Sequence, residues 1–534
     1  AFRRKPLPSL IHSRTFRPGR CSMSPSLPAF SALLAAAVAA TAAGGQATSA
    51  AALVARCAAG ANAAPGFCEG ALDTSGASVS LLQREAAAGA RALRMAPAAG
   101  AEPEPHTEEA QAPLPQTSCG AEDFAGRDIN LIIYGATGFT GQLASKYLAK
   151  DHPDKPRWAI GGRHRDELEE LQANLSALGT NAPSIIIADL QDPGSLQAMT
   201  RRAKAIVSYA GPYHKYGGEN LIRSAIATCT HYADLCGESA FKKEMLQKYG
   251  DAAKARGVAI VQALGMDSLP ADLLAMGAAE QLATDGHGPP TDITVYFSVL
   301  NSWFSGGTMA AGEEQRAAYG VDPNDKESAY ALAPEESIEA RVDETPAGTP
   351  PHTGASSSDM GYDANFSSMT MPYALGAIDG PTVRRSLALT FPDAPIHFAE
   401  VMGSGVLKEL AKFFSSPEAL AQPPNPSPVP GEGPPQWLLE GGSLTGQGLA
   451  ARGAPNAAQA RLHMHCKGDP AYQNTAKWSA ELALALAQEG PKGGVGGYLT
   501  PTVALGSEFI MQRLSRADSG NLCSFWWGSD PKSS

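Results

Sequence analysis

Short apolar runs alternate with longer segments of helical spacing between Asp128 and Gln262. Runs of Val, Ile, Leu and Ala without a polar period are typical of strands buried on both faces of a parallel sheet. The predicted strands are Ile129–Tyr134, Trp158–Gly161, Ser184–Ala188, Ala205–Tyr209, a strand that begins at His231, and Val258–Gln262. Because helical segments separate them, the pattern predicts an α/β fold with a doubly wound parallel sheet.

The first predicted strand runs directly into a glycine-rich turn and then into a helix. Glycines permit a tight turn and let backbone N–H groups approach a pyrophosphate, whose charge the helix N-terminus stabilises. The spacing GxxGxxG is a variant of the commoner GxGxxG, and the strand–turn–helix context makes it informative. We therefore expect a dinucleotide to bind at Gly135, Ala136, Thr137, Gly138, Phe139, Thr140 and Gly141.

The end of the second predicted strand distinguishes NADP(H) from NAD(H). An NAD enzyme carries an acid there for the ribose hydroxyls, whereas this chain carries Gly161 and Gly162, followed by Arg163. A guanidinium at this position pairs with a 2′-phosphate and stacks on adenine, while an acid would repel the phosphate. The pattern predicts NADP(H), and the alternative is that Arg163 merely caps a surface turn.

The next strand ends supply further candidate cofactor residues, because ligands of an open parallel sheet bind at its carboxyl edge. Asp189, after the third strand, is expected at the adenine edge. Ala210, Gly211 and Pro212, after the fourth strand, are expected beside the nicotinamide. Tyr213 follows them, and a role in catalysis is weighed evenly against simple packing of a loop aromatic.

Three acids, Glu238, Asp267 and Asp272, lie at or just beyond strand ends, where a proton donor or a substrate clamp belongs. Asp267 is the preferred acid–base candidate because Gly265 and Pro270 hold it in a strand-to-helix turn. An alternative of at least equal weight is that Asp267 or its neighbour caps the following helix.

The run His463-Met-His-Cys466 suggests a metal site at first sight. In a strand, alternation places both histidines on one face with Arg461 and Lys467, and the apolar residues on the other face. Acidic or further Cys ligands are missing nearby. We therefore interpret the segment as a strand with a cationic, solvent-facing side, and we predict no metal.

Together these motifs resemble the saccharopine dehydrogenase-like oxidoreductases, a family that includes the bacterial trans-acting enoyl reductases. In the first half the resemblance is carried by GATGFTGQL, GGRHR, AGPYHKYG, THYADLCGE and GMDSLPADL. The family order continues with Ser305–Thr308, Met371–Asp379, Val383–Ser386, Pro430–Pro434, Gly468–Tyr472 with Thr475, and Thr500-Pro501. The chain departs from the family at Ala471, where glycine is usual, and in Pro- and Ser-rich insertions at 345–359 and 422–435.

The resemblance implies a Rossmann domain, an inserted α+β second domain with its own mixed sheet, and a C-terminal segment that returns to the first domain. We place these parts at residues 127–270, 271–490 and 491–534, after a leader and linker at 1–126. The second domain is expected to serve substrate binding or dimerisation. The resemblance also implies NADP(H) and, in some members, lipid-related chemistry.

Charge and cysteine content narrow the classes of partner and compartment. The net charge of −11 is unevenly spread, since no Asp or Glu precedes Glu69. The acidic remainder would repel phosphate backbones, so we expect no nucleic-acid partner. The eight cysteines form no CxxC pair and half precede the folded part, which is not typical of a disulfide framework and favours a reducing compartment.

Residues 1–126 have the composition of a targeting segment and a linker. Ala1–Cys68 is rich in Ala, Ser and Arg and lacks acids, as transit peptides do. Within it, Ala29–Ala43 is apolar but shorter than the ~20 residues that span a bilayer. We expect a removable leader for a plastid or mitochondrion, the alternative being low-complexity sequence of no consequence. The composition of residues 96–116 predicts a disordered linker, so the folded part is expected to begin near Arg127.

We predict an NADPH-dependent reductase of a C=C or C=N bond in a small, lipid-like or amino-acid-like substrate, with Asp267 or Tyr213 as proton source. The alternative class is a catalytically idle nucleotide-binding protein at a lipid or membrane surface, for which Trp526-Trp527 is a contact candidate. Saccharopine itself is a weaker candidate substrate, because no cluster of Arg or Lys for a tricarboxylate is evident. Peripheral membrane or lipid-droplet association and a homodimer are further expectations.

Overall fold

The computed structural model describes residues 113–528, apart from 151, 153, 180, 320–329, 335–360, 374 and 454–457. Residues 1–112, which hold most of the predicted leader and linker, lie outside the described residues. The folded chain begins before Arg127, contrary to the prediction. Leu114 and Cys119 already pack against the core, and the Cys119 N–H donates to Arg256 O at 2.9 Å.

The first sheet is parallel throughout, with the strand order β3-β2-β1-β4-β5-β6-β13. Its strands are β1 Ile129–Tyr134, β2 Trp158–Gly162, β3 Ser184–Ile187, β4 Ala203–Ser208, β5 His231–Asp234, β6 Ala259–Val261 and β13 Gly497–Leu499. The order reverses between β1 and β4, which is the switch point where Rossmann sheets bind dinucleotides. The predicted Rossmann sheet is therefore confirmed.

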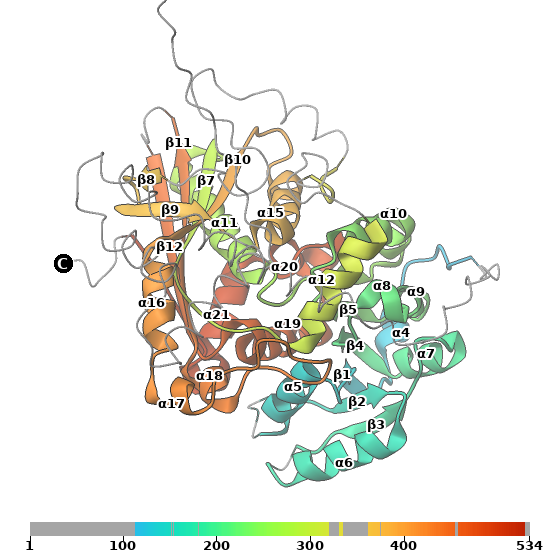
Figure 1. Cartoon of the computed structure of the whole chain (residues 1–534). Coiled ribbons are helices and arrows are strands. Elements are labelled where there is room, and N and C mark those ends of the chain that lie inside the picture. Colours follow the sequence, from blue (N-terminus) through green and yellow to red (C-terminus); the bar gives the residue numbers. More distant parts are fainter. Residues whose placement is uncertain are drawn as a thin grey trace, which may run out of the picture.

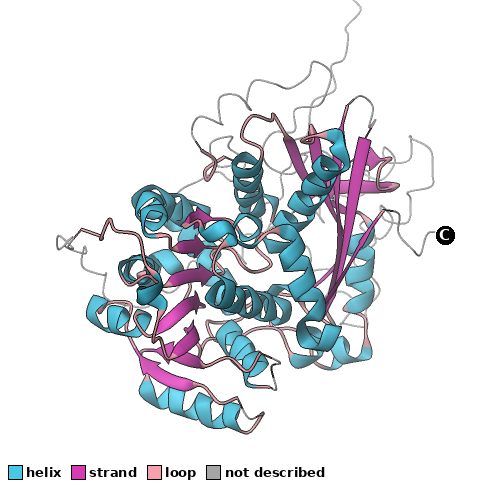
Figure 2. Cartoon of the chain, turned by 180° about the vertical axis from the view of Figure 1, so that it is seen from behind, coloured by secondary structure: helices cyan, strands magenta, loops and turns pink. Residues whose placement is uncertain are grey.

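Helices cover both faces of this sheet (Figure 1, Figure 2). Ile133 and Val207 face one core and their neighbours Ile132 and Ile206 face another, which explains why the strands are apolar without alternation. The first core includes α5 Phe139–Ala149, α6 Arg165–Ser176 and α19 Thr475–Glu489; the second includes α7 Pro193–Thr200, α9 Gly218–Ala227 and α10 Ser239–Arg256. The short helices α4 Ala121–Phe124 and α8 Tyr213–Tyr216 precede β1 and α9.

The second sheet is mixed and has the order β14-β12-β11-β7-β10-β9-β8, in which only β7 and β10 pair in parallel. Its strands are β7 Asp292–Asn301, β8 Gly361–Asp363, β9 Ser368–Pro372, β10 His397–Gly403, β11 Ser443–Arg452, β12 Ala458–Lys467 and β14 Cys523–Trp527. The remaining helices are α11 Leu269–Leu282, α12 Gly306–Tyr319, α15 Gly376–Thr390, α16 Gly405–Phe413, α17 Pro417–Ala421, α18 Gln436–Gly441, α20 Pro501–Leu505 and α21 Ser507–Gly520. Single turns at Ala283–His287, Pro470–Asn474 and Lys492–Gly494 complete the described helical elements.

Helices α11 and α19 lie between the two sheets and join them into one hydrophobic core (Figure 1). Two elements depart from the predicted domain boundaries. Helix α19 falls in the predicted second domain, 271–490, but its Ala- and Leu-rich surface packs over β1, β4 and β5. Strand β14 falls in the segment expected to return to the first domain, yet it pairs with β12, while β13 does return and extends the first sheet.

Two disulfides correct the prediction that the cysteines form no disulfide framework. They join Cys119 to Cys229 and Cys466 to Cys523, across sequence separations of 110 and 57 residues. Such long separations leave no local spacing signal, which is why the sequence pattern missed them. Cys236 is the free cysteine among the described residues, and it is buried.

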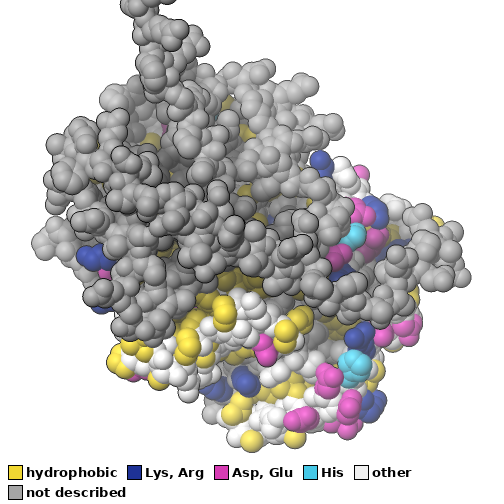
Figure 3. Space-filling model, in the orientation of Figure 1, with side chains coloured by type: hydrophobic (Ala, Val, Ile, Leu, Met, Phe, Trp, Pro, Cys, Tyr) yellow, Lys and Arg dark blue, Asp and Glu magenta, His cyan; other side chains and the backbone are white. Residues whose placement is uncertain are grey.

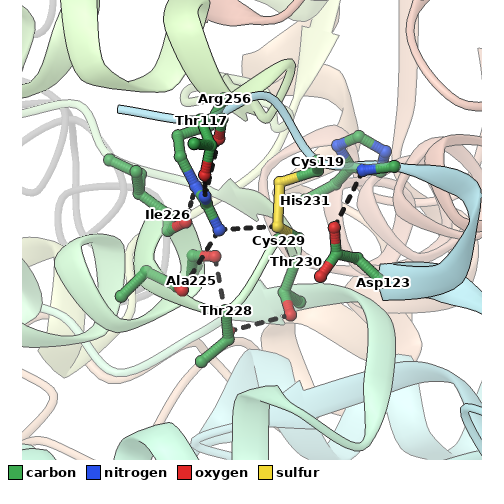
Figure 4. Close-up of a disulfide and its surroundings, with 12 residues drawn as sticks. Thr117, Cys119, Asp123, Ala225, Ile226, Thr228, Cys229, Thr230, His231 and Arg256 are labelled. Atoms are coloured by element: carbon green, nitrogen blue, oxygen red, sulfur yellow. Dashed lines mark hydrogen bonds between the residues drawn. A yellow bond between two sulfur atoms is a disulfide. The ribbon is translucent and has the colours of Figure 1, made fainter. Parts of the chain in front are cut away.

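The disulfide between Cys119 and Cys229 fastens the segment before β1 to the first sheet (Figure 4). Arg256 supports it from α10, with Nη1 donating to Thr117 O at 2.7 Å and Nη2 lying 2.7 Å from Cys229 Sγ. Asp123 lies near both sulfur atoms. Because those sulfurs are bonded to each other and are not thiolates, we assign no metal to this group.

The predicted cationic face of β12 is not fully open to solvent. His463 is 6% exposed, its ring stacks on Trp526 at a centroid distance of 5.1 Å, and its Nε2 lies 2.7 Å from Gly528 O. Strand β14 supplies this cover, so Trp526 is a packing residue, whereas Trp527 is largely exposed. Among the helices of the described residues, none has the length and apolar character needed to cross a bilayer.

Candidate active site

The glycine-rich turn brings β1, β4 and α5 into close backbone contact. Gly135 has φ +74°, and its N–H donates to Gly161 O at 2.9 Å. A Cβ at Gly135 would lie 2.9 Å from Ala210 N, and a Cβ at Gly141 would collide with Gly135 O. Backbone packing therefore requires both glycines. Gly138 differs, because its φ is −69° and its Cβ would lie 3.3 Å from Gly135 O. Backbone packing therefore does not require glycine at position 138, whereas the close approach of a ligand would.

The N-terminus of α5 points into this turn. Gly138 is the N-cap residue, and no side chain caps the helix. Ala136 is buried, but Thr137, Gly138, Phe139 and Thr140 are only half-buried. Backbone N–H groups at an uncapped N-terminus, together with the helix dipole, favour an anion. The residues present therefore fit the pyrophosphate of a dinucleotide.

Arg163 and Asp189 lie just after β2 and β3, at the carboxyl edge where the adenosine part of a dinucleotide is expected. Arg163 is exposed directly after β2, where its Nε donates to His164 Nε2 at 2.9 Å, and no side chain caps the following helix α6. Burial and the charge of Asp189 raise the pKa of Tyr134, while Arg163 lowers it, which places both charges near the end of β1. Asp189 Oδ1 accepts from Gln191 N at 2.9 Å. An exposed guanidinium here suits a 2′-phosphate.

The loop after β4 divides into an open part and a buried part. Ala210 and Gly211 are half-buried, and Gly211–Pro212 is a cis peptide. Tyr213 is 5% exposed, and its hydroxyl donates to Ser208 O at 2.9 Å and accepts from Leu235 N at 3.1 Å. These bonds hold the Tyr213 hydroxyl between the carboxyl ends of β4 and β5. Its hydroxyl is therefore occupied in packing, and we do not carry Tyr213 forward as a proton donor.

Two of the three candidate acids hold the backbone in place. Glu238 accepts from the N–H groups of Tyr213 and His214 at 2.8 and 3.1 Å, which fixes the start of α8. Asp272 is fully buried, and it accepts from Thr502 N at 3.0 Å and from the hydroxyls of Thr502 and Ser386. Asp272 thus ties α11 to α15 and α20. Both carboxylates are engaged with donors from the protein itself.

Asp267 differs from both. It lies half-buried in the turn after β6, and a Cβ at Gly237 would lie 2.9 Å from its Oδ2, so it faces the turn after β5. Burial raises the pKa of Asp267, and Lys242 lowers it. The alternative role as a helix cap is not observed: Ser268 is the N-cap of α11 and no side chain caps that helix. Ser268 has φ +125°, a strained conformation of the kind found at functional sites.

Behind Asp267 lies a set of buried polar side chains that the sequence patterns did not identify. We call it the inner polar cluster; it comprises Lys242, Asp267, Tyr373, Asp379, Arg384 and Glu400. Lys242 Nζ donates to Thr382 Oγ1 at 3.2 Å, and Ser268 Oγ donates to Asp379 Oδ1 at 3.3 Å. Lys242 comes from α10, Asp379 and Arg384 from α15, and Glu400 from β10. Asp379 and Arg384 fall within motifs quoted for the family resemblance, which is the signal that could have found them.

Segments of the second half of the chain cover the glycine-rich turn. The ring of Phe139 packs edge-on against Tyr472, with 5.6 Å between centroids, and contacts Gly433. Tyr472 in turn accepts from Ser305 N at 2.7 Å, at the start of α12. From there α12 reaches α8, where Glu314 pairs with Lys215 at 3.6 Å. The family motifs from the second half of the chain therefore meet over the glycine-rich turn.

Comparison with known proteins agrees with this architecture. Residues 131–261 match the family model described as saccharopine dehydrogenase NADP binding domain. A protein of Mycobacterium tuberculosis named "putative trans-acting enoyl reductase" is 31% identical over 424 residues, covering 73% of this chain and 96% of that protein. A trans-acting enoyl reductase of Mycobacterium ulcerans is 29% identical over 426 residues, covering 72% and 96%.

Among solved structures, apo saccharopine dehydrogenase (L-Glu forming) from Saccharomyces cerevisiae matches with a TM-score of 0.42 and 13% identity, over 75% of this chain and all of that one. The family model establishes NADP(H) as the cofactor, in agreement with Arg163 in place of an acid after β2. The sequence relationship extends over nearly the whole length of the bacterial proteins. The chain therefore belongs to the saccharopine dehydrogenase-like family of NADP-dependent oxidoreductases that includes the trans-acting enoyl reductases.

Proposed function

We propose that the protein reduces the C=C bond of an enoyl group in a lipid-related substrate, with Asp267 as the proton donor. The observation that carries this proposal is the position of Asp267. Of the three candidate acids, it alone is half-buried beside the strand ends after β5 and β6, while Glu238 and Asp272 are engaged with protein donors. The names of the bacterial relatives supply the enoyl class of substrate.

The protein's part in the reaction follows from charge and burial. NADPH, when bound, supplies a hydride to the substrate carbon farther from the activating carbonyl. Asp267 donates its proton to the adjacent carbon, so that the double bond gains one hydride and one proton. Burial favours the protonated form of Asp267 before the reaction, and the ammonium group of Lys242 stabilises the carboxylate that remains afterwards.

Apolar surface beside the crevice supports a lipid-related substrate. Leu420 and Val429 are 52% and 56% exposed on the segment that leads to Gly433, which contacts Phe139 of the glycine-rich turn. Figure 3 shows hydrophobic side chains in the region of α17 and α18. Acyl chains associate with such surface because burial contributes about 25 cal/mol per Å² of apolar area.

The test is NADPH oxidation with a series of enoyl thioesters of increasing chain length. We expect turnover that improves with chain length, and none with the matched saturated thioesters. Substrates with a C=N bond form the comparison set for amino-acid chemistry. Tight NADPH binding without turnover of any enoyl thioester would reject this proposal and favour an idle nucleotide-binding protein.

A further inference from the structure

Five polar atoms of the inner polar cluster are buried and have no hydrogen-bond partner among the described residues. They are Tyr373 Oη, Asp379 Oδ2, Arg384 Nη1 and both carboxyl oxygens of Glu400. The four side chains are between 1% and 5% exposed. An unpaired buried polar group costs about 1–3 kcal/mol, so such a concentration calls for a functional explanation.

The side chains of Asp379 and Glu400 lie within hydrogen-bonding reach of each other. Two ionised carboxylates have no proton to donate, which leaves Asp379 Oδ2 and both Glu400 oxygens without a partner unless one of the two groups is protonated. Two carboxyls at close range in a dry site do not both ionise, so one proton is shared between them. Burial raises the pKa of Glu400 to about 8, despite the lowering effects of Asp379 and Arg384. Burial and the charges of Glu400 and Asp267 raise the pKa of Asp379 well above its ordinary value.

Other charged groups around the pair come from every neighbouring element. Lys242 of α10 lowers the pKa of Asp379. Arg384 of α15 lies 5.2 Å from the ring centroids of both Tyr330 and Phe398, and its positive charge lowers the pKa of Glu400. Lys242 and Arg384 therefore stabilise the single negative charge that the pair carries while it shares one proton.

A path connects the pair to Asp267. Ser268 is the next residue in the chain, and its Oγ donates to Asp379 Oδ1 at 3.3 Å. Tyr373 Oη makes no hydrogen bond to a carboxyl among the described residues, so the path does not include it. The Ser268 hydroxyl can accept a proton from one carboxyl and pass one to the next.

We propose that Asp379 and Glu400 hold one shared proton and return it to Asp267, by way of Ser268, after each reduction. The proposal rests on the function proposed above. One proton leaves Asp267 for the substrate, one moves from the pair to Asp267, and one from solvent restores the pair through Asp267 once the product has left. Asp379 and Glu400 are thus positioning residues that act through Asp267.

The first test needs no substrate and follows the free energy of unfolding with pH. In the wild type, stability falls as pH rises from about 4.3, where Glu ionises in the unfolded chain, to about 8, where Glu400 ionises in the folded protein. Glu400→Gln should lose the part of this slope above about pH 6, because Asp234, Asp272 and Asp469, each with a pKa of about 6, contribute below it. Asp379→Asn is the second variant if glutamine impairs folding. The matched control Asp272→Asn removes a buried acid with a pKa of about 6, so it should change the slope only below about pH 6.

The second test measures kcat against pH, with the solvent deuterium isotope effect, on whichever substrate the wild type reduces. In Glu400→Gln, reprotonation of Asp267 should become rate-limiting. The alkaline fall of kcat should therefore move to lower pH, and kcat near pH 8 should be roughly tenfold lower. KM for NADPH should not change. The isotope effect should increase in this variant but not in Asp272→Asn.

Each outcome bears on a separate claim. An unchanged slope of stability above about pH 6 in Glu400→Gln would overturn the shared proton. A lost slope with an unchanged kcat profile and isotope effect would make the pair purely structural and overturn the relay. A wild type that reduces no substrate rejects the proposed function and the relay together, while the unfolding curves still decide whether the proton is shared.

Discussion

The expected cofactor site is built from backbone groups of one stretch of chain, Gly135–Gly141, with Arg163 close behind it in sequence. The inner polar cluster, by contrast, depends on side chains from α10, the turn after β6, the residue after β9, α15 and β10, which span more than 150 residues of sequence, from Lys242 to Glu400. The first, the cofactor end, is half-buried and open to an anion, and the second, the substrate end, is almost wholly buried. The difference indicates that cofactor binding and proton chemistry are separable, so mutations at one end should leave the other intact.

The largest expected effect is at the substrate end. Asp267→Asn keeps the shape of the side chain but removes the proton, so kcat should fall by about 10²–10⁴-fold, the usual contribution of a general acid. Because burial raises the pKa of Asp267, wild-type activity should be highest below that pKa and fall as pH rises through it. Steady-state kinetics with an active enoyl thioester measure kcat and its pH dependence, and titration with NADPH measures the affinity for the cofactor. A comparable loss of NADPH affinity would show that the two ends are not separable.

The two ends also differ in how far sequence alone could predict them. Six strands of the first sheet were predicted from local apolar runs, since burial on both faces leaves a signal within each strand. The turn at Gly135–Gly141 was predicted because its geometry is local. Lys242 and Glu400 gave no signal, because their surroundings form only when distant elements pack. The orientation of Tyr213 was equally inaccessible, since its two hydrogen bonds join different strands.

A disulfide remote from both ends gives the next largest effect. Cys119–Cys229 lies at the amino edge of the first sheet, before β5, whereas the crevice lies at the carboxyl edge. Replacing both cysteines by alanine should lower the free energy of unfolding by about 2–4 kcal/mol and leave NADPH affinity unchanged. Urea unfolding with and without reductant measures the free energy of unfolding, and the wild type under reductant is the matched comparison.

The same disulfides bear on where the protein acts. Disulfides are typical of an oxidising compartment, whereas the cysteine spacing favours a reducing one, so the two indications differ. Organelle targeting by the leader expected within residues 1–126 stays a prediction, as do membrane association and a homodimer. Mass mapping of the purified protein without reductant should find both bonds; free thiols at all four positions would restore the original expectation.

Gly138→Val tests the cofactor end directly. Its Cβ would meet only Gly135 O, at 3.3 Å, so the turn should fold, but the side chain would lie where phosphate oxygens approach the N–H groups of α5. Loss of one charge-assisted contact of about 2–3 kcal/mol corresponds to a roughly 30- to 150-fold rise in the Kd for NADPH. The matched variant Gly141→Val should instead unfold the turn, because its Cβ collides with Gly135 O. Unchanged affinity in a folded Gly138→Val protein would refute the placement of the pyrophosphate.

The smallest expected effect concerns the choice between NADPH and NADH. Arg163 is exposed, so its pairing with a 2′-phosphate is screened by solvent, and Arg163→Ala should raise the Kd for NADPH only about tenfold, or about 1.4 kcal/mol. NADH lacks that phosphate, and its Kd should change by less than about twofold. Arg165→Ala is the matched control, since Arg165 is exposed on α6 and pairs with Glu169. Equal weakening of both cofactors would mean that Arg163 contributes general positive charge and not recognition of the 2′-phosphate, and the preference for NADP(H) would then have to come from another part of the adenosine end.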